Sequence, residues 1–192
     1  LLVVVLGVYL VVVLRTAWLA EDAYITFRTV DNFINGYGLT WNTTERVQGF
    51  TNPMWMFLVS FFYLFTDEIF FTTIFLSVGI SLLAVLVLSL KIAATGRSAL
   101  LAVTVLLFSR AFIDYSTSGL ENPLTHIILA LFLVTYLRAE IHPRTLFMLS
   151  LLAGLGALNR MDTILFFTPP LIFAAWKSRD PRSILLVAAG FS

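Results

Sequence analysis

The chain of 192 residues is 59% hydrophobic and only 12% charged, with a formal net charge of +1 and a mean hydropathy of +0.95. Soluble domains contain roughly 45–50% apolar and about 25% charged residues, so this composition excludes an ordinary soluble domain and predicts a polytopic membrane protein. The absence of cysteine excludes disulfides and thiolate metal sites. No basic tract indicates a nucleic-acid partner.

Apolar runs occupy residues 1–20, 53–65, 69–90, 98–113, 123–137, 145–158, 163–176 and 183–192. A membrane-spanning helix needs about 20 residues. The short run 53–65 therefore predicts an interfacial or re-entrant helix, begun by a turn at Thr51-Asn52-Pro53. The last run is too short to be complete, which indicates a fragment of a longer protein, incomplete at both ends. For residues 1–20, a first transmembrane helix is favoured over a signal peptide that ends at Ala20, because several apolar runs follow. The predicted fold class is all-α, a polytopic transmembrane helical bundle.

The distribution of basic residues predicts the orientation. If 53–65 does not span, the segments 91–97, 138–144 and 177–182 share one side and carry seven Lys and Arg residues with two acids. The other side carries nine acids and five arginines: Arg15, Arg28, Arg46, Arg110 and Arg160. Cytoplasmic loops carry an excess of Lys and Arg. Residues 21–68 are therefore predicted to be a first external loop with juxtamembrane helices.

This loop begins with two adjacent carboxylates, Glu21 and Asp22. Residues 22–35 predict an amphipathic helix in the membrane interface, because their apolar side chains recur at helical spacing. Asp22 is predicted at the N-cap of this helix. A cap needs one acceptor and leaves Glu21 unexplained, so a catalytic or ligand-binding role stays open beside the capping role. Arg28 and Asp31 have the i,i+3 spacing of a plain surface pair.

Further along, the loop 35–52 carries Tyr37, Trp41 and Phe50. Aromatic side chains at this position fit either a belt at the lipid headgroups or stacking against a sugar. Of these two roles, the belt at the lipid headgroups is favoured, and stacking against a sugar stays open.

Four polar clusters fall on the predicted outer side: Glu21-Asp22, Thr51-Asn52-Pro53, residues 114–122, and residues 159–162. Placing a charged group at membrane depth costs a few kcal/mol of free energy unless the group is paired or lies in a water-filled cavity. The clusters therefore predict a polar pocket at the outer membrane surface. Glu121 also fits an ordinary inter-helix turn. Arg160 is either neutralised by Asp162 or binds a phosphate bidentately, and both interpretations stay open.

Five motifs follow the acidic pair in order: AYITFR (23–28), NGYGLTWN (35–42), ERVQGFTNP (45–53), TSGLENP (117–123) and NRMD (159–162). In this order and spacing they resemble the GT-C membrane glycosyltransferases. The resemblance is strongest to the actinobacterial cell-wall arabinofuranosyltransferases that add terminal β-(1→2) arabinose. It covers about residues 15–176, with a specific block at 21–53 and generic helices around it.

The resemblance implies a multi-pass GT-C fold in the plasma membrane with its active site on the outer face. The implied donor is a polyprenyl-phosphate sugar, and the implied acceptor is a cell-envelope glycan. The acidic residue that activates the acceptor hydroxyl corresponds to Asp22, with Glu21 as the other candidate, and Arg160 corresponds to a residue that holds the lipid phosphate. The remaining candidates for binding substrate or lipid phosphate are Arg28, Asn52, Glu121 and Asp162. The soluble C-terminal domain of the family is missing from this sequence.

The chemistry of the residues agrees with this expectation. Glycosyl transfer needs a base for the incoming hydroxyl and positive charge for the leaving phosphate. The outer acids could instead hold a divalent cation against that phosphate; no other cofactor is expected. The alternatives are a polyprenyl-phosphate hexose or aminosugar transferase, a transporter or flippase, and a non-catalytic membrane scaffold. A transporter would place ionisable residues within its spans, whereas here they gather at one surface.

Overall fold

The computed structural model describes residues 1–45, 47, 49–138, 140, 142–178, 187 and 190, and every regular element in this part of the chain is helical. The helices are α1 (Leu2–Arg15), α2 (Glu21–Ile34), α3 (Pro53–Thr66), α4 (Ile69–Val87), η1 (Leu88–Ile92), α5 (Gly96–Phe108), α6 (Arg110–Tyr115), α7 (Asn122–Arg138), α8 (Pro143–Asn159), η2 (Met161–Thr163) and α9 (Ile164–Ser178). The predicted all-α fold class is confirmed for the described residues. Arg46, Arg179, Asp180, Arg182 and most of the run 183–192 lie outside them.

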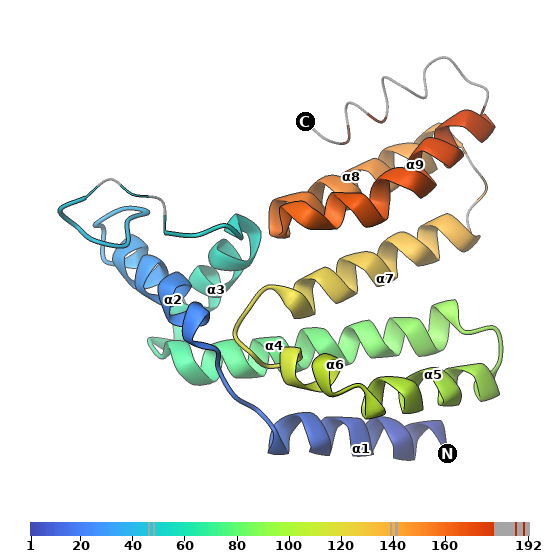
Figure 1. Cartoon of the computed structure of the whole chain (residues 1–192), viewed down its shortest axis with the longest axis horizontal. Helices are drawn as coiled ribbons and strands as arrows, with labels where there is room; N and C mark the ends of the chain where they lie inside the picture. Colours follow the sequence, from blue (N-terminus) through green and yellow to red (C-terminus); the bar gives the residue numbers. More distant parts are fainter. Residues whose placement is uncertain are drawn as a thin grey trace.

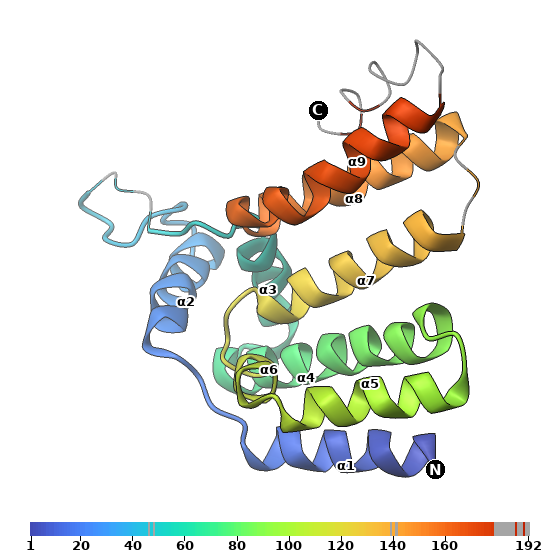
Figure 2. The ribbon, with the colours of Figure 1, turned by 45° about the vertical axis from the view of Figure 1, so that its right-hand side comes forward.

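Six helices, α1, α4, α5, α7, α8 and α9, lie side by side in an array (Figure 1). Along the chain each of them runs in the opposite direction to the one before it, and the second view shows the same arrangement (Figure 2). Helices α2 and α3 lie beyond one end of the array, which we call the α2–α3 end. The run 53–65 is therefore a separate short helix outside the array, and the parity of the following helices agrees with the sequence-based prediction.

The charged residues divide between the two ends of the array. Lys91 in η1, Arg97 at the start of α5 and Arg138 at the end of α7 belong to the end opposite α2 and α3. Arg144 in the first turn of α8 and Lys177 in the last turn of α9 join them. The arginines and acids of α2, α6 and η2 belong to the α2–α3 end. The segregation expected from the sequence is thus present among the described residues.

One helical stretch in the described part of the chain is long and apolar enough to cross a membrane, by length and composition. It is the 24-residue stretch Ile69–Ile92, formed by α4 and η1. Apolar but shorter helices occupy Leu2–Arg15, Pro53–Thr66, Gly96–Phe108 and Asn122–Arg138. The polytopic arrangement of the chain remains a prediction.

One local prediction was wrong, and one apolar run is divided. The N-cap of α2 is Ala20, in extended conformation, and no side chain caps this helix, so Asp22 lies within the first turn and is not the cap. The apolar run 98–113 is not one helix, because Ser109 leaves the helical conformation and its hydroxyl accepts a hydrogen bond from the backbone N–H of Phe112 at 3.3 Å. That cap starts the separate short helix α6.

Gly119 joins the elements at the α2–α3 end. Its φ of +77° is a backbone conformation that favours glycine, and an added Cβ would lie 2.8 Å from the Cβ of Ala23 in α2. The indole N–H of the fully buried Trp55 in α3 donates to the carbonyl of Gly119 at 2.9 Å. The turn before α7 is therefore fixed against both α2 and α3.

Helices α8 and α9 pack closely at Gly156. An added Cβ there would lie 2.3 Å from the ring of Phe167, which is 1% exposed. A glycine at this position lets the two helices approach closely. This packing fixes the short connection between them, which carries Arg160 and Asp162.

Candidate functional site

An open cleft of about 710 Å³ lies at the α2–α3 end. Its walls come from α2, the residues before α3, the turn before α7 and the connection between α8 and α9. The lining residues are Asp22, Ile25, Thr26, Gly49, Phe50, Thr51, Asn52, Leu120, Glu121, Asn159, Arg160, Met161 and Asp162. Segments more than a hundred residues apart in the sequence therefore meet in one cleft, and all four predicted polar clusters contribute to it.

Glu121 connects three of these segments. Its Oε2 accepts a hydrogen bond from Nδ2 of Asn52 at 2.8 Å, and its Oε1 lies 3.3 Å from Nη1 of Arg160. Its backbone carbonyl accepts a bond from Nδ2 of Asn159 at 3.0 Å. The side chain of Glu121 is only 13% exposed, and both of its carboxylate oxygens have partners. This geometry makes Glu121 a structural link of the cleft, with its carboxylate already committed.

Arg160 is held by two carboxylates. Its Nε donates to both oxygens of Asp162, at 2.8 and 3.0 Å, and its Nη1 donates to Glu121 and to Asn122. The hydrogen bond to Asp162 raises the pKa of the Arg160 guanidinium above its ordinary value, so Arg160 stays positive at any physiological pH. The sequence left open whether Arg160 is neutralised by Asp162 or binds a phosphate; in the structure it is paired with Asp162. The Nη2 group has no hydrogen bond among the described residues, so two N–H donors are left for a ligand.

Two amide side chains in the lining are almost fully buried. Asn52 is 5% exposed and Asn159 is 0% exposed. Nδ2 of Asn159 donates to Thr125 as well as to Glu121, which fixes its orientation. The Oδ1 atoms of both asparagines have no hydrogen-bond partner. Both side chains therefore hold the walls of the cleft together through their Nδ2 groups, and their Oδ1 atoms are buried.

The acidic pair at the start of α2 is divided by the helix. Asp22 lines the cleft, whereas Glu21 does not. Both side chains are exposed, and neither has a hydrogen-bond or ion-pair partner among the residues that the structure describes. Their place in the first helical turn stabilises negative charge through the helix dipole. Of the two carboxylates, Asp22 is the one that a ligand in the cleft can contact.

Arg28, expected among the phosphate-binding residues, does not line the cleft. Its guanidinium carbon lies 4.6 Å from the ring centroid of Trp41, and its Nη2 donates to Asn42 at 3.2 Å. The expected pair with Asp31 is not formed, because Asp31 accepts a bond from the hydroxyl of Tyr63 at 3.0 Å. Arg28 therefore holds the loop after α2 and is removed from the candidate site.

The charges in the cleft do not balance. Among the described residues, its lining contains three carboxylates, Asp22, Glu121 and Asp162, and one guanidinium, Arg160. Within the described residues no group of three or more His, Cys, Asp and Glu side chains could hold a metal ion. A site of the magnesium type needs only one or two carboxylates together with water and a substrate phosphate. The expectation of a divalent cation thus stays untested.

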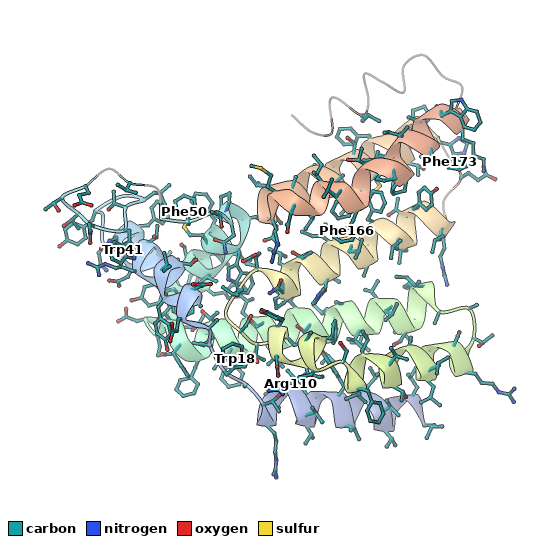
Figure 3. All side chains as sticks on the ribbon, viewed as in Figure 1. Trp18, Trp41, Phe50, Arg110, Phe166 and Phe173 are labelled. Carbon is teal, nitrogen blue, oxygen red and sulfur yellow. The ribbon has the colours of Figure 1, made fainter. Side chains whose placement is uncertain are left out.

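Sequence reasoning missed Ile25 and Thr26, and it did not single out Phe50 among the aromatic residues of the loop. Thr26 follows Asp22 by four residues on the same helix, and this spacing places both on one face of α2. Phe50 belongs to the aromatic loop, and Figure 3 shows it near α3, while Trp41 lies further out along the loop. The i,i+4 rule could have identified Thr26, but nothing in the sequence separates Phe50 from Trp41.

The comparisons with known proteins give no match to any family model, to any curated protein or to any solved structure. The likeness to the GT-C glycosyltransferases accordingly rests on the sequence motifs, and its functional consequences are proposals.

Proposed function

We propose that the chain belongs to a membrane glycosyltransferase. It would move a sugar, arabinofuranose by the resemblance, from a polyprenyl-phosphate donor to a cell-envelope glycan at the outer face of the plasma membrane. The observation that carries the proposal is the cleft itself, which combines the uncommitted carboxylate of Asp22 with the guanidinium of Arg160.

These two groups match the two charges that develop in the reaction. A hydroxyl oxygen of the acceptor bonds to the anomeric carbon while the bond from that carbon to the phosphate oxygen breaks. The phosphate leaves with the electron pair of that bond, and the hydroxyl proton passes to a base, for which Asp22 is positioned. Arg160 stabilises the negative charge on the leaving phosphate.

The exposed apolar side chains support a multi-pass membrane protein. Large hydrophobic residues are exposed along several helices of the array, including Val3, Val4 and Val11 of α1, Leu101 and Val105 of α5, and Leu165, Phe166, Ile172 and Phe173 of α9. Figure 3 labels Phe166 and Phe173 on α9, where they are 69% and 50% exposed. Apolar surface of this extent is unusual on soluble monomers and is expected where a protein contacts lipid.

The positions of the charged residues favour an enzyme over a transporter. Transporters place their binding sites near the bilayer midplane. Charged residues of α5, α8 and α9 lie in their terminal turns, and α4 contains none. The cleft correspondingly lies at the α2–α3 end of the array, as expected of an enzyme that acts at a membrane surface.

The orientation is tested by cysteine labelling, for which the cysteine-free chain is suited. We expect Glu45→Cys to react with a membrane-impermeant maleimide added outside intact cells. Arg97→Cys should react only after the cells are permeabilised, because Glu45 and Arg97 belong to opposite ends of the array. Labelling of both positions from one side would contradict the proposed arrangement.

The activity is tested by adding radiolabelled polyprenyl-phosphate sugars to membranes that contain the full-length protein. We expect label to enter the acceptor glycan from a pentose donor, and not in membranes that lack the protein. Transfer from a hexose or aminosugar donor alone would keep the reaction class and select the alternative substrate. Failure with every lipid-phosphate donor, in membranes where the folded protein is detected, would refute the proposal.

A further inference from the structure

We infer that Asp162 is an internal competitor for the phosphate-binding atoms of Arg160, and that it keeps the affinity of the cleft for free phosphate low. The inference rests on the proposed function, since it concerns how the same cleft selects a lipid-linked phosphate. It concerns Asp162 itself, which sequence reasoning treated only as a phosphate-site candidate or as the neutralising partner of Arg160.

The hydrogen bonds of Arg160 identify the atoms involved. Nη1 is committed to Glu121 and Asn122, whereas Nε is held by Asp162 alone. Nη2 has no hydrogen bond among the described residues. An anion that binds the guanidinium in the bidentate manner through Nε and Nη2 must therefore replace Asp162. An anion that uses only Nη2 must share the guanidinium with two carboxylates.

Burial decides which of the two carboxylates yields. The side chain of Asp162 is 60% exposed and belongs to the three-residue turn η2, so water can solvate its charge when it leaves Arg160. The side chain of Glu121 is 13% exposed and is also bound by Asn52. Separating Glu121 from Arg160 would leave a largely buried charge without its counter-charge, which is costly. Glu121 is thus the fixed partner of Arg160 and Asp162 the exchangeable one.

This difference has a consequence for the ligand. Inorganic phosphate gains only polar contacts, which must exceed the interaction of Asp162 with the same guanidinium. A phosphate on a polyprenyl chain is anchored in the bilayer beside the cleft, so its effective concentration at the cleft is far above that of a freely diffusing phosphate. An internal carboxylate therefore keeps abundant free phosphate from occupying the cleft, and the tail lets the lipid-linked phosphate overcome it.

The test measures binding of inorganic phosphate, and separately of a polyprenyl monophosphate, to the purified chain in lipid nanodiscs at low salt. We expect Asp162→Asn to bind both ligands about two- to fivefold more tightly, the range appropriate to an exposed ion pair. In transfer assays, the inhibition constant for inorganic phosphate and the donor KM should fall by the same factor. Asp162→Ser, which is too short to reach the guanidinium, should behave alike and serves if the first variant does not fold.

The matched control is Asp114→Asn. It removes the same charge from another arginine ion pair, Arg110 and Asp114 at 3.3 Å, and Asp114 does not line the cleft. We expect no change in phosphate binding. Unchanged or weaker binding in both Asp162 variants would overturn the inference, and weakening only when Mg²⁺ is present would instead identify Asp162 as a metal ligand.

A third variant separates this inference from the proposed function. Arg160→Gln should lose phosphate binding. If Arg160→Gln loses phosphate binding and the Asp162 variants do not bind phosphate more tightly than the wild type, only the inference about Asp162 fails. If Arg160→Gln binds phosphate like the wild type, the phosphate role of Arg160 fails, and with it that part of the proposed function.

Discussion

Replacing Asp22 by Asn is expected to lower the rate of sugar transfer by about 10²- to 10⁴-fold, the usual contribution of a general base. The amide keeps the shape of the side chain but cannot accept the proton of the acceptor hydroxyl at neutral pH. Asp22 has no partner among the described residues, so the substitution breaks no ion pair and should leave the fold intact. The measurement is transfer from a labelled polyprenyl-phosphate sugar, with thermal unfolding of both proteins recorded alongside.

Glu21→Gln is the matched control, since it makes the same chemical change one residue earlier in the same helical turn. Glu21 does not line the cleft, so we expect the Glu21→Gln variant to transfer sugar at a rate within about twofold of the wild type, as for a surface substitution. The pair of variants thereby decides which carboxylate is the base. Full activity of Asp22→Asn with loss in Glu21→Gln would exchange the two assignments, and full activity in both would remove the acidic pair from the mechanism.

The meeting of the polar clusters in one cleft was predictable, because it depends only on whether the number of array helices between two clusters is even or odd. In an array of alternating helices, polar segments separated by two spans return to the same end. The length of the run 53–65 was the decisive quantity, since one additional span there would have moved every later cluster to the other end. The structure keeps this run outside the array as α3, and the clusters accordingly meet in one cleft.

Local boundaries were less predictable because single hydrogen bonds decide them. Ser109 looks like part of an apolar run, yet its hydroxyl caps α6 and ends α5. Asp22 has the residue type of an N-cap, but the extended conformation of Ala20 places the N-cap two residues earlier, at Ala20. Propensity at such positions is weak compared with the tertiary contacts that fix the backbone, here the bond from the N–H of Ala20 to the carbonyl of Ser118 at 2.8 Å.

The partners of long side chains could not be read from spacing. Arg28 and Asp31 have the spacing of a helix pair, yet each bonds to a different segment of the chain, Arg28 to the loop after α2 and Asp31 to Tyr63 of α3. Arg160 could be assigned to Asp162, two residues away. Its second carboxylate, Glu121, is 39 residues away and reaches it only because α7 and α8 pack together. Tertiary packing thus decides whether an arginine binds a ligand or another part of the protein.

Arg160→Gln is expected to reduce sugar transfer by about 10²- to 10³-fold, the effect of removing one preorganised donor from a developing anion. Among the described residues that line the cleft, Arg160 is the only cation, so none of the others can replace its charge on the leaving phosphate. Arg160→Lys should retain part of the activity, since an ammonium keeps the charge but loses the planar arrangement of donors. The transfer assay described for Asp22 measures both variants.

Stability must be separated from catalysis, because Glu121 loses its counter-charge in Arg160→Gln. Asn52 would still donate to Glu121, but this carboxylate is only 13% exposed and loses its counter-charge, so we expect Arg160→Gln also to lower stability, and thermal unfolding must show that the variant is folded before its rate is compared. Arg110→Gln is the matched control: it removes an exposed arginine from the ion pair with Asp114, away from α8 and α9 (Figure 3), and should keep full activity. If Arg160→Gln folds and transfers sugar at the wild-type rate, the leaving phosphate is stabilised without Arg160. The surplus of carboxylates in the cleft would then favour a divalent cation in that role.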